Sequence, residues 1–128
     1  MGRKKIVAKF KDGSVMKGML VDFSPDKTIL KLIPSNGGIQ LIATENLKAV
    51  FFVKDFQGTK KHKENYKDAN PWAGKKIQLH FNDGEIIIGY TLHYDLGNQG
   101  FFVTPADGSS NNDNIFVIVS AINKITFL

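Results

Sequence analysis

Two decapeptides in opposite halves of the chain decide the fold: "KFKDGSVMKG" at residues 9–18 and "HFNDGEIIIG" at residues 80–89. Both contain Phe-x-Asp-Gly, then four residues and a second Gly. Inward and outward positions alternate with period two on either side of each Asp-Gly, a pattern typical of a β-hairpin with a type I′ turn. A glycine inside the second strand indicates a bulge or bend. The sequence therefore predicts two similar, bent hairpins.

The similarity continues beyond the hairpins. Short apolar runs predict three further strands in each copy, with one helical turn before the last: 28–33, 39–43 and 48–53 in the first, 100–105, 115–119 and 124–128 in the second. The difference in residue number between equivalent positions of the two copies is constant up to Pro34 and Pro105. A longer polar loop in the second copy then increases it, so that Phe52 is equivalent to Phe127. We therefore predict an all-β chain of two tandem five-stranded SH3/Sm-like small barrels, related by an internal repeat.

The charge distribution divides the chain into three parts. Residues 1–53 hold nine basic and four acidic side chains, residues 54–76 hold seven and three, and residues 77–128 hold one and five. The net charges are thus +5, +4 and −4. We predict a basic first barrel at 1–53, a lysine-rich linker at 54–72 and an acidic second barrel at 73–128. A basic half can bind an anion, or it can be neutralised by an acidic half.

The residues of the first hairpin resemble the N-terminal motif of the Sm-like (Lsm/Hfq) superfamily, which the sequence matches at Phe10, Asp12, Gly13, Gly18 and Leu20. The resemblance implies a small barrel and binding of uridine-rich RNA. Its RNA-contacting positions would fall at Ser24, Thr28, Asp95 and Gln99, and the Arg-Gly pair of that superfamily is missing here. The second copy also resembles a bacterial module of unknown function, through Gly-Phe-Phe-x-x-Pro at 100–105, Asn-Asn at 111–112 and Ile-Phe-Val at 115–117.

Several classes of function find no support in the sequence. There is no cysteine, so thiol catalysis, disulfides and thiolate metal sites are excluded. No Gly-x-Ser-x-Gly or phosphate-binding glycine loop occurs, and the turn aspartates Asp12 and Asp83 are explained by turn chemistry. No apolar run suits a signal peptide or a membrane span. We predict a cytoplasmic protein that is not an enzyme and uses no cofactor, metal or small-molecule substrate.

Two sets of side chains remain as candidates for binding. Lysines and one arginine could contact an anion or nucleic acid: Arg3, Lys4, Lys5, Lys9, Lys11, Lys17, Lys60, Lys61 and Lys63. Aromatic residues could form an interface, since adjacent rings in a strand point to opposite faces: Phe51, Phe52, Trp72, Phe101 and Phe102. Our main hypothesis is an adaptor that binds a protein partner or itself. The alternative is a single-stranded nucleic-acid (RNA) binder that uses the first hairpin and the linker.

Overall fold

The structure, a computed structural model, describes residues 4–54, 74–92, 97–106 and 112–128. The strands follow one another as β1 (Lys5–Phe10), β2 (Val15–Asp22), β3 (Ile29–Pro34), β4 (Gln40–Ala43), β5 (Leu47–Val53), β6 (Lys75–Phe81), β7 (Ile86–Thr91), β8 (Gly100–Pro105), β9 (Asn112–Ile118) and β10 (Ile122–Phe127). Single 3₁₀ turns, η1 (Thr44–Asn46) and η3 (Val119–Ala121), precede β5 and β10. The all-β prediction is confirmed. We call β1–β5 the first half and β6–β10 the second half.

The two Asp-Gly hairpins close in the same way. The amide of Gly13 donates to the carbonyl of Phe10 (3.1 Å), and that of Gly84 donates to Phe81 (2.9 Å). Positive φ occurs at Gly13 and Gly84 and at no described non-glycine residue. The predicted type I′ turn is therefore wrong, because it requires positive φ at two residues. The loop has three residues, with the glycine supplying the left-handed conformation that this longer connection needs.

The two bend glycines also have equivalent surroundings. A Cβ on Gly18 would lie 2.5 Å from the carbonyl oxygen of Ile33, and a Cβ on Gly89 would lie 2.5 Å from that of Thr104. No side chain fits so close to a neighbouring strand, so both positions require glycine. The internal repeat thus extends to individual backbone contacts.

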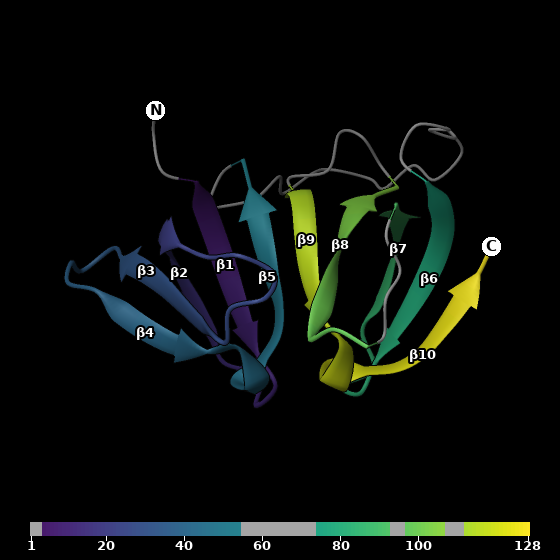
Figure 1. Cartoon of the computed structure of the whole chain (residues 1–128), viewed down its shortest axis with the longest axis horizontal. Coiled ribbons are helices and arrows are strands. Elements are labelled where there is room, and N and C mark those ends of the chain that lie inside the picture. The colour runs from purple at the N-terminus through teal and green to yellow at the C-terminus, as the bar shows by residue number, and fades with distance from the viewer. Residues whose placement is uncertain (1–3, 55–73, 93–96, 107–111) are drawn as a thin grey trace.

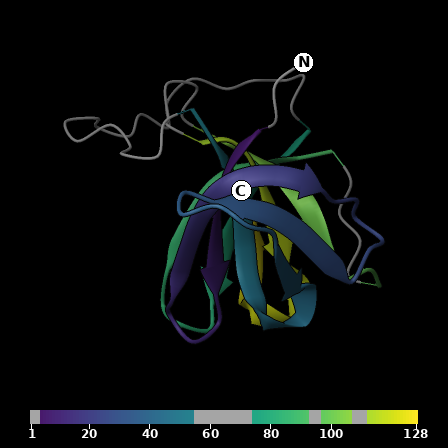
Figure 2. The same ribbon diagram turned by 90° about the vertical axis from the view of Figure 1, so that its left-hand side faces the viewer.

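All ten strands belong to one sheet, in the order β10-β6-β7-β8-β9-β5-β1-β2-β3-β4. The halves join where β5 and β9 pair, and β4 and β10 lie at opposite ends (Figure 1). Figure 2 looks onto the end where β4 lies, with the first half in front of the second. The sheet does not close on itself, so the predicted pair of separate barrels is not confirmed.

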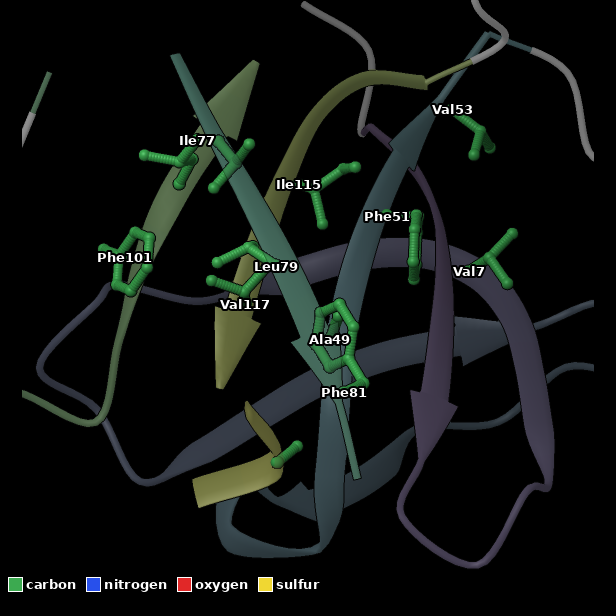
Figure 3. Packing of buried hydrophobic residues seen from close by; sticks show 12 residues of the cluster. Val7, Ala49, Phe51, Val53, Ile77, Leu79, Phe81, Phe101, Ile115 and Val117 are labelled. Atoms are coloured by element: carbon green, nitrogen blue, oxygen red, sulfur yellow. The ribbon is translucent and has the colours of Figure 1, made fainter. Parts of the chain in front are cut away.

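Each of the two hydrophobic cores contains side chains from both halves. One core holds Ile77, Leu79 and Val117 of the second half together with Phe51 and Val53 of the first, and Figure 3 shows these side chains on β6, β9 and β5. The other core belongs mainly to the first half but includes Phe116 and Ile118 from β9. Because neighbouring residues of a strand point to opposite faces, β5 and β9 each serve both cores. The two halves are therefore packed as one unit.

Candidate functional site: an aromatic groove between the halves

The junction between the halves places aromatic side chains from both on one face of the sheet. Strands β5 and β9 run antiparallel, with Val50 opposite Phe116 and Phe52 opposite Asn114. The ring of Phe102, on β8, lies with its centroid 6.2 Å from that of Phe52 and 5.0 Å from that of Phe116. Phe23, from the segment after β2, packs edge-on against Phe116 at 5.0 Å. Phe116 is fully buried beneath these partly exposed rings.

Two adjoining hollows extend over these rings, with volumes of about 520 Å³ and 450 Å³. They share Pro25, Phe102 and Asn114, so they form one continuous depression, which we call the junction groove. The first hollow is completed by Lys4, Lys5, Leu20, Phe23, Phe52 and Val53. The second is completed by Tyr90, Leu92, Asn98, Gly100, Phe101, Thr104 and Phe116. A lining that is mostly apolar, with a few polar groups, is typical of a binding site.

One polar group among the lining residues has no hydrogen-bond partner in the part of the chain that the structure describes. The hydroxyl of Tyr90 is buried and has no hydrogen-bond partner among the described residues. The Tyr90 side chain lines the second hollow. A buried hydroxyl without a partner costs free energy, because it has lost its bonds to water.

The charge of the groove is positive at one end. Lys4 and Lys5 line the first hollow, and the Lys4 ammonium lies 5.8 Å from the centre of the Phe52 ring. Neither hollow has an acidic side chain among the described residues that line it. An anionic group bound at this end would therefore be attracted by Lys4 and Lys5.

A glutamine from the second half fixes one wall of the groove. The amide Nε2 of Gln99 donates to the backbone carbonyls of Pro25 and Lys27, each at 2.6 Å. Its Oε1 accepts a hydrogen bond from the hydroxyl of Thr44 (2.7 Å), which is itself buried. These bonds attach the segment between β2 and β3, including Pro25, to the second half. The groove wall is thus held in place across the junction.

The predicted basic residues that the structure describes make different contacts. Lys9 lies over the ring of Phe51, with its ammonium 4.5 Å from the ring centre, whereas Lys11 donates to the Ser120 hydroxyl (2.6 Å). Lys17 is exposed on β2, opposite Val7. Lys4 and Lys5 are the two predicted cations in the groove lining. Arg3, Lys60, Lys61 and Lys63 lie outside the described residues.

The predicted aromatic pairs divide between the core and the groove. Phe51 and Phe101 are buried, whereas Phe52 is partly exposed and Phe102 is 36% exposed. The predicted alternation of adjacent rings between the two faces is therefore seen in both pairs. Trp72 lies outside the described residues.

A buried lysine that the sequence reasoning missed links the halves away from the groove. The ammonium of Lys48 contacts Asp83 (2.7 Å) and Glu85, both in the second hairpin, and lies 4.9 Å from the centre of the Phe81 ring. Burial disfavours the charge of Lys48, but its hydrogen bonds to Asp83 and Glu85 outweigh burial and raise the pKa of the ammonium. The hydrogen bond from Lys48 in turn lowers the pKa of Asp83. Lys48 is an ion-pair residue of the junction.

Other site residues were also missed or have a different role. Phe23, Tyr90 and Asn114 line the groove but were not predicted; the signal for Phe23 was an aromatic residue just before the Pro25-Asp26 turn. Among the positions that correspond to RNA contacts in the Sm-like superfamily, Gln99 holds the junction and the Thr28 carbonyl accepts the Thr44 amide (2.9 Å). Asp95 lies outside the described residues.

Comparison with known proteins identifies the family. The model of a family of unknown function, DUF6982, matches residues 2–128, nearly the whole sequence. This chain belongs to DUF6982. No curated protein and no solved structure matches the DUF6982 chain. In its described residues, no helix is long and apolar enough to cross a membrane.

Proposed function

We propose that this DUF6982 protein is a non-catalytic binding protein that acts through protein contacts, with the junction groove as its binding site. The occupant would be an extended segment of a partner protein, with apolar or aromatic side chains and at least one carboxylate. The observation that carries this proposal is the groove itself: partly exposed Phe52 and Phe102, with Phe102 packed on the fully buried Phe116.

The aromatic rings suit anchor residues of a partner. Interfaces draw most of their free energy from a few large side chains in well-packed pockets, and aromatic residues are frequent among them. Phe102 rests on the fully buried Phe116, so its position is fixed before a ligand binds. A pre-organised ring loses less conformational entropy on binding than a mobile one.

The polar groups of the groove suit an extended backbone and an acidic side chain. The side-chain amide of Asn114, which lines both hollows, can bond to a peptide carbonyl or amide, which an extended segment presents along its length. At the other end, Lys4 and Lys5 attract a carboxylate. These features together define the partner as apolar and acidic.

The contacts of the other lysines on the first hairpin argue against the nucleic-acid alternative. Binding of single strands combines a continuous positive groove with stacking aromatics. Here Lys9 covers Phe51 and Lys11 contacts Ser120, so both are engaged away from Phe52 and Phe102. Two lysines beside a mostly apolar depression favour a peptide.

We also infer that each half is a small barrel of the Sm-like kind, with units at 1–53 and 73–128 and a linker at 54–72. Support comes from the strand order, which within each half is fifth-first-second-third-fourth, and from the shared bend glycines. The lack of cysteine suits a reducing cytoplasm.

The test is selection of a displayed library of random peptides on the full chain. We expect enriched peptides that combine aromatic or aliphatic residues with Asp or Glu. Phe102→Ala and Lys4→Glu should each weaken their binding by about tenfold or more. Ile86→Ala and Lys31→Glu, at exposed positions outside the groove, are the matched controls and should leave affinity unchanged.

Two outcomes would overturn the proposal. One is peptides whose affinity is unaffected by both groove variants. The other is failure to select any peptide while labelled oligouridine binds at about 50 mM salt and loses affinity in the Phe102→Ala and Lys4→Glu variants. That second result would assign the groove to single-stranded nucleic acid.

A further inference from the structure

The internal repeat relates the two strands of the junction to the two free edges of the sheet. In the fourth and fifth strands of each half, equivalent residues keep one constant offset, which also aligns η1 (Thr44–Asn46) with η3 (Val119–Ala121). Strand β9 therefore corresponds to β4, and β5 corresponds to β10. Within the chain, β5 and β9 pair with each other, whereas β10 and β4 end the sheet. The chain thus carries the counterparts of both junction strands on its open edges.

Exposed apolar side chains gather at these two edges. Leu41 on β4 is 63% exposed and Ile39 just before it is 61% exposed, while Phe127 and Leu128 at the other edge are 50% and 60% exposed. Leu41 is the counterpart of Phe116, which is fully buried at the junction. Phe127 is likewise the counterpart of Phe52. The edges therefore expose positions that are more buried at the internal junction.

The edge backbones have little protection against pairing. Native sheets usually protect their edges with charges, prolines or bulges. Strand β4 has the sequence Gln-Leu-Ile-Ala, without a charge or a proline, and β10 contains one lysine, Lys124, and a register shift against β6 between Ile122 and Lys124. The pairing of β5 with β1 has a similar shift, and β5 still pairs with β9. Both edges can accept a further antiparallel strand.

We propose that copies of this chain associate head to tail, through antiparallel pairing of β10 in one copy with β4 in the next. The register follows from the junction, where Val50 lies opposite Phe116 and Phe52 lies opposite Asn114. Moving each residue to its counterpart puts Ile125 opposite Leu41 and Phe127 opposite Ile39. Leu41 then enters the second-half core beside Ile125, as Phe116 enters the first-half core beside Val50.

Charge and polarity agree with this arrangement. Head-to-tail contact brings residues 77–128 of one copy, net charge −4, against residues 1–53 of the next, net charge +5. Asn123, the counterpart of Lys48, meets Asp12 and Ser14, the counterparts of Asp83 and Glu85. Lys124 and Thr126 replace the buried Ala49 and Phe51, so this contact buries less apolar surface than the internal junction and is weaker. Because the two contacting surfaces differ, the assembly closes into a ring or extends as a filament.

The test uses two variants of the full chain, each with one edge blocked. Leu41→Lys places a charge on the β4 edge and leaves β10 intact, and Phe127→Lys does the reverse. In sedimentation velocity, we expect the mass of the wild type to rise with concentration and each variant alone to remain monomeric. Mixing the variants should give a dimer, because the intact β10 of one fits the intact β4 of the other.

Controls separate the outcomes. Both side chains are half-exposed or more, so each variant should keep the circular dichroism and melting temperature of the dilute wild type. Ile86→Lys, at an exposed position away from both edges, and Phe102→Ala in the groove should leave self-association unchanged, which makes this test independent of peptide binding. A wild type that stays monomeric at its highest soluble concentration overturns the proposal. So does a mixture of the edge variants that forms no dimer.

Discussion

Phe116 and Leu41 occupy equivalent positions in the two copies of the repeat, but Phe116 is fully buried and Leu41 is 63% exposed. The backbones around them match: each residue lies in a fourth strand that pairs with a third and leads into a single 3₁₀ turn. What differs is the next strand in the sheet, since β9 has β5 beside it and β4 has no further strand beside it among the described residues. The repeat thus determines local structure, whereas position in the sheet determines burial.

The largest expected effect contrasts these two residues directly. Phe116→Ala should lower the free energy of unfolding by about 3–5 kcal/mol, because it leaves a cavity below Phe23 and Phe102 in a core shared by both halves. Leu41→Ala, measured on dilute monomer, should change it by less than about 0.5 kcal/mol. Urea denaturation followed by circular dichroism measures both. Similar losses for the two variants would contradict the difference in burial.

Unlike Phe116 and Leu41, the two bend glycines should lose similar amounts of stability when they are substituted. Gly18→Ala and Gly89→Ala each force a Cβ against a carbonyl of the neighbouring strand, and each should cost about 1–3 kcal/mol by urea denaturation. Ser35→Ala, in an exposed turn, is the control and should be nearly neutral. A large effect at one glycine alone would mean that the repeat does not extend to the bends.

The sequence predicted well what depends on neighbouring residues. Period-two alternation around Asp-Gly located the hairpins, and the second glycine of each motif located the bends at Gly18 and Gly89. The helical turns predicted before the last strands are present as η1 and η3. These features have local causes: turn geometry, strand alternation and close backbone approach.

The junction could not be predicted in the same way. Pairing of β5 with β9 joins segments from opposite halves of the chain, and no local pattern distinguishes it from pairing within each half. The groove is a product of that pairing, so Tyr90 and Asn114 had no signal of their own. The same pairing gives Lys11, one of the predicted basic residues, a hydrogen bond across the junction to Ser120.

The smallest expected effect concerns the ion pair of the junction. Lys48→Met should lower the free energy of unfolding by about 1–2 kcal/mol, less than the roughly 3–5 kcal/mol typical of a broken buried pair, because the carboxylates keep contact with water. The side chains of Asp83 and Glu85 are 46% and 38% exposed. Asn123→Met, at the equivalent position on the free edge, is the control and should be close to neutral by urea denaturation. A larger loss at Asn123 would contradict the assignment of the ion pair to the junction.

The stabilisation lost in Lys48→Met should depend on pH in a direction that follows from the two pKa shifts. The pKa of Asp83 is lowered in the folded chain, so its contribution is complete above the unfolded pKa, about 4, and is lost as the pH falls through the folded pKa. The pKa of Lys48 is raised, so its contribution is complete below about pH 10 and is lost as the pH rises through the folded pKa. The difference in free energy of unfolding between wild type and Lys48→Met should therefore be constant between these limits and decrease beyond each.

Carboxyl chemical shifts provide an independent measurement of the ion pair. Lys48→Met should raise the pKa of Asp83 and leave that of Asp12 unchanged, because the pKa of Asp12 is lowered by hydrogen bonds from Ser14. An unchanged pKa at Asp83 would show that the lysine does not hold the second hairpin against β5.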